Sequence, residues 1–240
     1  LYLACLWATS ITYAALDCTT AVNITVPVSE CQALVALYTG TNGPWWNVNT
    51  LWDTDTNICT WPGITCATIV GQLHVTKVWP TSNGWSLFAN SLQWPLHTSS
   101  LSGLIYLQEL DLSFNELYGV LSPGWSTMTS MRYFDVSDNS INSTLPSSWS
   151  TWTNIQYFDV SSNQLTWSLP SSWSTWQSPF MRNGIQTIRL FYNNFTGTIP
   201  SSWSTFTNLM IFDADHAGLG GTLPSSLSTW ASLRSFDISY

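Results

Sequence analysis

The stretch MRYFDVSDNSINSTLPSSWSTW, residues 131–152, returns almost unchanged as IQYFDVSSNQLTWSLPSSWSTW at residues 155–176. Each copy begins with alternating apolar residues, passes an Asn and a Pro, and ends with two tryptophans. Related segments start at Leu107, Met131, Ile155, Ile185, Leu209 and Leu233, with spacings of 24, 24, 30, 24 and 24 residues. The chain therefore carries five complete repeats and the beginning of a sixth.

The pattern inside each repeat predicts how neighbouring repeats pack. Alternating apolar residues indicate a strand, and the Pro indicates where regular structure stops. One repeat cannot bury its own apolar side, so we expect the repeats to stack into a solenoid with a parallel sheet along one face. Interior amides would then bridge the backbones of adjacent turns, in a ladder of Asn115, Asn139, Asn163 and Asn193. Ala217 interrupts this ladder, and we expect a local irregularity there.

The repeat resembles the 24-residue plant-type leucine-rich repeat, LxxLxxLxLSxNxLxGxIPxxLxxLxx, and residues 30–66, which end in CTWPGITC, look like the N-terminal cap of that family. The tryptophan-rich wording resembles cell-surface leucine-rich repeat proteins of kinetoplastid protists, such as the promastigote surface antigen group. The resemblance implies an α/β solenoid. It would have a parallel β-sheet on the concave face, short helical or 3₁₀ turns on the convex side and a disulfide-bonded N-terminal cap.

The chain divides into four expected segments. Residues 1–14 read as the remnant of a signal peptide, because an apolar run leads to Thr12-Tyr13-Ala14, which suits cleavage after Ala14. The alternative, a membrane anchor, needs roughly 20 apolar residues, more than this run provides. Residues 15–70 are expected to form the cap, and residues 71–106 one or one-and-a-half degenerate repeats that include a strand at VTKVWP. Residues 107–240 are expected to form five regular repeats and a partial sixth. The extra residues within QSPFMRNG predict a loop before Ile185.

Four cysteines remain after such a cleavage, and an even count behind a signal peptide favours disulfides over metal binding. Three pairings are possible, and the short loop CTWPGITC favours Cys59 with Cys66, which leaves Cys18 with Cys31. Sequons at Asn23, Asn142 and Asn194 agree with a secretory route and predict N-glycosylation.

Charge is scarce: 8% of residues are charged, against roughly 25% in an ordinary domain, and the net charge is −8. Five basic residues spread along the chain make no basic patch, so the sequence predicts neither a nucleic-acid partner nor an anionic membrane surface. Attachment to a membrane would need an anchor outside this chain.

The tryptophans near the end of each repeat are three residues apart, which places them on one side of a short helical turn. Exposing such rings would forfeit burial of on the order of 150–250 Å² each, so we expect them in the core, with the intervening serines toward solvent. The residues concerned are Trp125, Trp149, Trp152, Trp173, Trp176, Trp203 and Trp230. Trp167 occupies a position that is Gly in three other repeats, and it is either an exposed contact or the cover of a neighbour.

Strand alternation directs one column of residues to the concave side: Asp111, Asp135, Asp159, Arg189, Asp213 and Asp237. Carboxylates about 4.8 Å apart repel one another unless water, cations or hydrogen bonds relieve the repulsion. Calcium is an alternative, but each strand supplies one such Asp and LDLS is ordinary wording for the family, so no metal site is predicted.

The candidate ligand-binding residues vary on the same face: Arg132, Tyr133, Tyr157, Arg189, Phe191, Tyr192, Asp215 and His216. Aromatic and Arg side chains dominate interface energies, although ordinary surface variation would leave the same pattern. Asp213, Asp215 and His216 lie together, but the sequence has no G-x-S-x-G, H-E-x-x-H or phosphate loop, and an open sheet provides no enclosed pocket. We expect neither an enzyme nor a cofactor.

These features predict a secreted or cell-surface leucine-rich repeat glycoprotein that acts through binding. The resemblance to the family implies that its concave face would recognise a protein or glycan, or mediate adhesion. The alternative is a structural subunit of a coat or filament that stacks through uncapped solenoid ends, because the sequence stops at FDISY within an expected strand. Inhibition of a secreted hydrolase, a role implied by the plant-type resemblance, is a third possibility that no particular residue supports.

Overall fold

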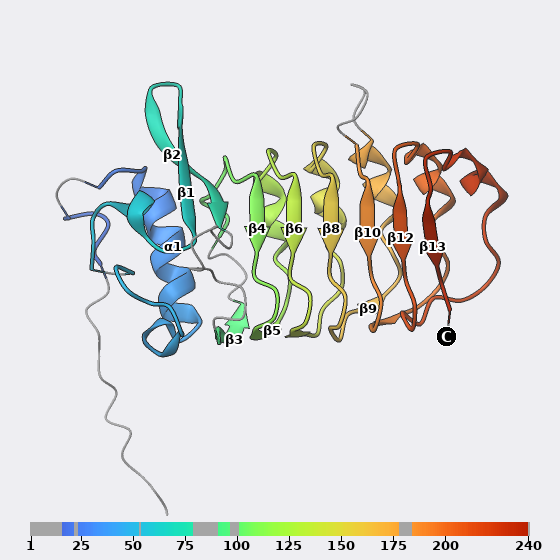
Figure 1. The fold of residues 1–240 in the computed structure, drawn as a ribbon, viewed down its shortest axis with the longest axis horizontal. Coiled ribbons are helices and arrows are strands. Elements are labelled where there is room, and N and C mark those ends of the chain that lie inside the picture. The colour runs from blue at the N-terminus through green and yellow to red at the C-terminus, as the bar shows by residue number, and fades with distance from the viewer. Residues whose placement is uncertain are drawn as a thin grey trace, which may run out of the picture.

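The computed structural model describes residues 16–21, 24–52, 54–78, 91–96, 101–177 and 184–239. The expected signal peptide remnant, the sequon at Asn23 and most of the expected loop within QSPFMRNG lie outside these residues. The described parts form a solenoid whose main sheet has eight strands in the order β1-β2-β4-β6-β8-β10-β12-β13 (Figure 1). This arrangement confirms the predicted solenoid with a parallel sheet.

The N-terminal part of the solenoid is built on one helix and one hairpin. Helix α1, Val28–Gly40, precedes two 3₁₀ turns, η1 at Gly43–Trp45 and η2 at Ile58–Thr60. Strands β1, Ile64–Ile69, and β2, Gln72–Val78, pair antiparallel, and β2 contains the VTKV of the expected strand. Because β2 then pairs in parallel with β4, it joins the hairpin to the repeat sheet.

Two disulfides fasten this part of the chain. Cys18 bonds to Cys31 in the first turn of α1, and Cys59 in η2 bonds to Cys66 in β1. These are the two pairs that the sequence favours. The carboxylate of Glu30, buried at the start of α1, accepts a hydrogen bond from the amide of Val75 and lies 2.7 Å from Nδ1 of His74, so the helix is also tied to the hairpin.

Each repeat contributes one short strand to the main sheet. These are β4 at Glu109–Asp111, β6 at Tyr133–Asp135, β8 at Tyr157–Asp159, β10 at Thr187–Arg189, β12 at Ile211–Asp213 and β13 at Ser235–Asp237. They pair in parallel and in register, so that Tyr133 lies opposite Tyr157 and Asp135 opposite Asp159. The central residues of the first five of these strands, such as Phe134 and Phe158, are buried in the core, whereas Phe236 in β13 is 38% exposed.

A second set of very short parallel strands lies along the lower edge of the solenoid in Figure 1. It consists of β3 at Gln93–Leu96, β5 at Glu116–Gly119 and β7 at Ser140–Ile141, with a separate pair, β9 at Thr166–Trp167 and β11 at Asn194–Phe195. The repeat pattern in the sequence does not predict these strands. β5, β7, β9 and β11 follow the ladder asparagines, whose hydrogen bonds link the backbones of adjacent turns.

The asparagine ladder connects successive turns. The Nδ2 group of Asn163 donates to the carbonyls of Val136, Val160 and Ser161, and its Oδ1 accepts from the amide of Ile141. Asn115, Asn139 and Asn193 bond in the same manner. At Ala217 the amide of Phe195 donates instead to the Ala217 backbone oxygen, 2.9 Å away, which is the irregularity expected there.

The convex side is a row of 3₁₀ helices that carry the tryptophans. These are η3 at Pro123–Thr127, η4 at Ser147–Thr151, η5 at Ser171–Trp176, η6 at Ser201–Thr205 and η7 at Ser225–Thr229. All seven tryptophans expected in the core are buried. Trp149 stacks between Trp125 and Trp173, with ring centroids 5.9 and 6.4 Å away, and its Nε1 donates to the carbonyl of Ser122 in the preceding turn.

The hydroxyl residues between the tryptophans do more than face solvent. Ser148 donates to the carbonyl of Pro123 and Thr151 to that of Ser126, each in the preceding turn. Equivalent bonds recur along the convex side from Thr127 to Ser232. The segment TLPSSWSTW, residues 144–152, therefore both buries its tryptophans in the core and forms hydrogen bonds to the turn before it.

Candidate functional site

Two tyrosines from neighbouring strands stack on the concave side of the sheet. Tyr133 on β6 and Tyr157 on β8 lie in register, with ring centroids 4.4 Å apart and planes inclined by 3°. Because parallel strands hold equivalent residues at the strand spacing, two tyrosines at the same repeat position stack in this way.

The tyrosines cover the carboxylates of the next concave position. Tyr133 donates to Oδ2 of Asp135, and Tyr157 donates to Oδ2 of Asp159. The hydroxyls of Ser137 and Ser161 donate to the other oxygen of each carboxylate. The acidic column thus faces the concave side as expected, and three of its carboxylates, those of Asp111, Asp135 and Asp159, are buried. Hydrogen bonds from Ser and Tyr hydroxyls offset part of the predicted repulsion between them. Asp213 is half-buried and Asp237 is exposed.

Burial also changes the ionisation of this column. Loss of water around Asp135, together with the charge of Asp159, raises the pKa of the Asp135 carboxyl to about 7. Burial likewise raises the pKa of Asp111. The phenol pKa values of Tyr133 and Tyr157 rise because of burial and the nearby carboxylates, so both hydroxyls remain protonated donors.

Arg189 on β10 extends this row. Its Nη1 donates to the hydroxyl of Tyr157 over 2.9 Å and lies 3.6 Å from Oδ2 of Asp159, while the guanidinium carbon is 5.7 Å from the centre of the Tyr157 ring. We call Tyr133, Tyr157 and Arg189 the tyrosine row. Arg132, one residue before Tyr133, is exposed beside it.

A second group of candidate residues gathers at the C-terminal end of the concave strands. Tyr192 lies 5.8 Å from Phe191 and 5.2 Å from His216 between ring centroids, and Nδ1 of His216 is 2.8 Å from Oδ1 of Asp215. We call these four residues the Tyr192 cluster. Phe191 is two residues after Arg189, so the cluster and the tyrosine row meet on the turn that contains β10.

The exposure of Tyr192 has a backbone cause. The residue before each ladder position has a positive φ in all five repeats: Phe114, Asp138, Ser162, Tyr192 and His216. This corner turns the side chain out of the sheet, and Tyr192 is 54% exposed. The alternation rule alone does not predict such a corner, because it assumes extended backbone.

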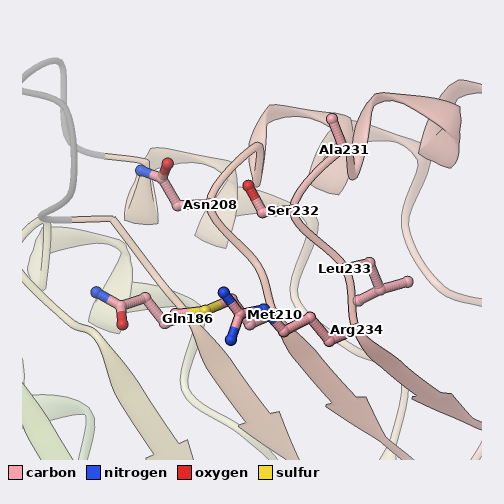
Figure 2. Close-up of a pocket in the computed structure, with 7 residues that line it drawn as sticks. All are labelled: Gln186, Asn208, Met210, Ala231, Ser232, Leu233 and Arg234. Carbon is pink, nitrogen blue, oxygen red and sulfur yellow. The ribbon is translucent and has the colours of Figure 1, made fainter.

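A hollow lies at the other end of the strands, where β10, β12 and β13 begin (Figure 2). It has a volume of about 730 Å³, and its lining residues are Gln186, Asn208, Met210, Ala231, Ser232, Leu233 and Arg234. Figure 2 shows Gln186, Met210 and Arg234 side by side across the strands. Gln186, Met210 and Arg234 were not among the residues predicted to bind a ligand. Their position on the concave side could have indicated them, but none of them is aromatic.

Trp167 lies away from the concave face, on β9 at the lower edge. Its side chain is 69% exposed and its φ is +70°. Of the two expectations for this residue, the structure supports exposure and not the covering of a neighbour.

Within the described ranges, no group of three or more His, Cys, Asp or Glu residues is arranged to hold a metal ion. No helix in those same ranges is both long enough and apolar enough to cross a membrane.

Comparisons with known proteins agree with this geometry. Residues 105–165 match one family model described as Leucine rich repeat, and residues 184–206 match a second of the same description. The fold is a leucine-rich repeat solenoid. A comparison with curated protein sequences finds no match.

Solved leucine-rich repeat structures superpose on most of the chain. The GASSHO1/SCHENGEN3 ectodomain from Arabidopsis thaliana is 22% identical with a TM-score of 0.73, over 86% of this chain and 23% of that one. The SOBIR1 ectodomain from Arabidopsis thaliana is 22% identical with a TM-score of 0.64, over 84% of this chain and 100% of that one. A TDR receptor is 30% identical with a TM-score of 0.56, over 60% of this chain and 24% of that one.

These likenesses establish the fold and not a ligand. The chain spans 23–32% of the length of the first three receptor chains that it matches, and 100% of the shorter SOBIR1 chain. Function must therefore be argued from this chain's own surface.

Proposed function

We propose that this chain is an extracellular leucine-rich repeat glycoprotein that recognises a protein or glycan partner through its concave face. The tyrosine row is the observation that carries the proposal. Each of its three side chains is held by a hydrogen bond or a stacking contact before any partner arrives. Such a surface loses little side-chain entropy on docking, which favours affinity.

The chemistry of the face favours recognition over catalysis. Arg and Tyr side chains are enriched among the residues that dominate binding energies, and here they lie beside the Tyr192 cluster on one rigid sheet. The acidic groups underneath are occupied by hydrogen bonds within the protein. We therefore assign the contacts to Arg132, Tyr133, Tyr157, Arg189, Phe191, Tyr192, Asp215 and His216.

A protein or peptide is the first candidate for the partner. Two of the similar structures are described as complexes of plant receptor ectodomains with CASPARIAN STRIP INTEGRITY FACTOR 2 and with an IDA peptide hormone. A glycan is the second candidate, because stacked aromatic rings also suit sugars. The kinetoplastid resemblance favours display on a cell surface, with adhesion as the biological outcome.

The extracellular setting is part of the same proposal. Two disulfides suit an oxidising compartment, and the sequons at Asn142 and Asn194 lie on exposed residues. We propose glycosylation at Asn23, Asn142 and Asn194, a signal peptide remnant over residues 1–14, a cap over 15–70, degenerate repeats over 71–106 and regular repeats over 107–240.

Panning of a random-peptide library and screening of a glycan array against the purified glycoprotein would supply binding probes. The affinity of each probe is then measured for the wild type, for Tyr157→Ala with Tyr192→Ala, and for Tyr118→Ala. Tyr118 is an exposed tyrosine on β5, outside the concave face, and serves as the matched control. We expect the double variant to bind at least about tenfold more weakly, a loss of about 1.4 kcal/mol, with the control unchanged.

Equal affinity of all three proteins for every probe would remove the concave face as the binding surface. Circular dichroism would first show that the variants keep the wild-type fold. Light scattering tests the alternative, a subunit that stacks through its solenoid ends: growth of large particles with concentration would favour assembly, and a stable monomer would contradict it.

A further inference from the structure

Trp167 occupies a backbone position that suits glycine. The equivalent residues Gly119, Gly197 and Gly221 have φ values of +94°, +79° and +79°, and Trp167 has +70°. A bulky L-residue in this region meets steric opposition that glycine avoids. The solenoid therefore tolerates a strained tryptophan at a site where its own repeats use glycine, and the ring is left largely in solvent.

Two sequons flank this tryptophan, one on each neighbouring turn. On one side, β9 pairs with β11, so that Asn194 lies opposite Thr166, and the amide of Thr196 donates to the carbonyl of Trp167 over 3.1 Å. On the other side, the amide of Thr166 donates to the carbonyl of Ser143, within the sequon that begins at Asn142.

Asn194 is the attachment point that strand pairing places one residue from Trp167 in register. It lies opposite Thr166, the residue directly before Trp167, on a strand hydrogen-bonded to β9. Asn194 and Trp167 are both exposed, whereas Phe195, which lies opposite Trp167, is buried. Both residues are therefore exposed along the same edge of the solenoid, on adjacent strands about 4.8 Å apart.

We propose that Trp167 is the platform on which the first sugars of an N-linked glycan at Asn194 pack. One face of a pyranose ring presents C–H groups, and an exposed indole offers a wide apolar surface to receive them. The inference depends on the proposed glycosylation. It adds that the glycan is ordered against this edge and leaves the concave face open.

Because Trp167 is strained, Trp167→Gly should change the melting temperature in opposite directions with and without the glycan. Without the glycan, Trp167→Gly should raise the melting temperature, because glycine fits the positive φ and an exposed ring loses few contacts. With the glycan, the same substitution should lower it by about 2–4 °C, because the sugar contact disappears. If Trp167 made no contact with the glycan, Trp167→Gly would raise the melting temperature both with and without the glycan.

The experiment uses protein secreted from a eukaryotic host, with occupancy at Asn194 measured by glycopeptide mass spectrometry. Melting temperatures are compared for the wild type, Trp167→Gly, Asn194→Gln and the two combined. Asn142→Gln is the matched control, in which the effect of Trp167→Gly should equal that seen in the wild type.

An unoccupied Asn194, or equal effects of Trp167→Gly with and without Asn194, would overturn the proposal. The proposal would also be overturned if the effect of Trp167→Gly depended on Asn142 and not on Asn194, because Trp167 would then contact the glycan at Asn142. Probe affinity of the concave face is measured separately, so the outcome here is distinct from that of the binding proposal.

Discussion

At the scale of single residues, tryptophan fills the core positions that leucine occupies in the related repeat pattern. It can also donate a hydrogen bond from its indole nitrogen to the preceding turn. Trp149 is fully buried, and its indole nitrogen donates to Ser122 in the preceding turn. Within the described residues, Nε1 of Trp125 has no acceptor. Both indole rings are therefore fully buried, but only that of Trp149 makes a hydrogen bond.

We expect Trp149→Phe to destabilise the protein by about 1–2 kcal/mol more than Trp125→Phe, because only the first removes a buried hydrogen bond. Urea unfolding followed by circular dichroism measures both. Equal losses would mean that the indole bonds to the preceding turn contribute nothing to stability.

Because Asp135 is buried, we expect the stability of the folded protein to fall as the pH rises. The pKa of Asp135 is raised from 3.8 to about 7, so the folded state holds a proton that the unfolded state releases. The stabilisation from Asp135 is complete below about pH 4 and is lost as the pH rises to about 7 and above. Thermal melts should therefore show lower stability at pH 8 than at pH 5.

Asp135→Asn is the matched control for this pH effect. The amide cannot ionise, so the fall in melting temperature between pH 5 and pH 8 should shrink by the contribution of this residue. The same slope in the variant and the wild type would show that Asp135 does not titrate in this range.

At the scale of elements, two ladders hold neighbouring turns together at opposite ends of the sheet strands. The first ladder follows the strands and is made by asparagine side-chain amides. The second is made by tryptophan indoles and Ser/Thr hydroxyls of the 3₁₀ helices. Each strand of the main repeats has only three residues, so strand pairing alone supplies few bonds. The stability of a turn depends on its neighbours, as expected for a solenoid.

Asn163→Ala should cost about 2–4 kcal/mol, because it leaves the Ile141 amide and several carbonyls without their side-chain partner. Gln164→Ala changes the next residue, which is exposed, and should cost less than about 0.5 kcal/mol. Similar unfolding midpoints for both variants would contradict the role of the ladder.

At the scale of the whole molecule, periodicity predicted what recurs in every repeat. The parallel sheet, the inward tryptophans, the asparagine ladder and its break at Ala217 all follow from the 24-residue frame. Features that depend on contacts between particular side chains did not follow. The hydrogen bond from Tyr133 to the buried Asp135 depends on the residue types of this repeat, and the exposure of Tyr192 requires a positive φ at the corner.

The hollow at Gln186, Met210 and Arg234 escaped prediction for a similar reason. A sequence pattern assigns these residues to the concave side, but the volume between them depends on how far each side chain reaches across the strands. The second set of strands was missed because segments of two to four residues give too short a pattern to distinguish from loop.

Hydroxyl-radical footprinting of the complex with a selected probe tests the central claim most directly, since it compares two similarly exposed tyrosines in one sample. We expect binding to slow the oxidation of Tyr192, which is 54% exposed, and to leave Tyr118, which is 44% exposed, unchanged. Protection of Tyr118 with no change at Tyr192 would contradict recognition through the concave face.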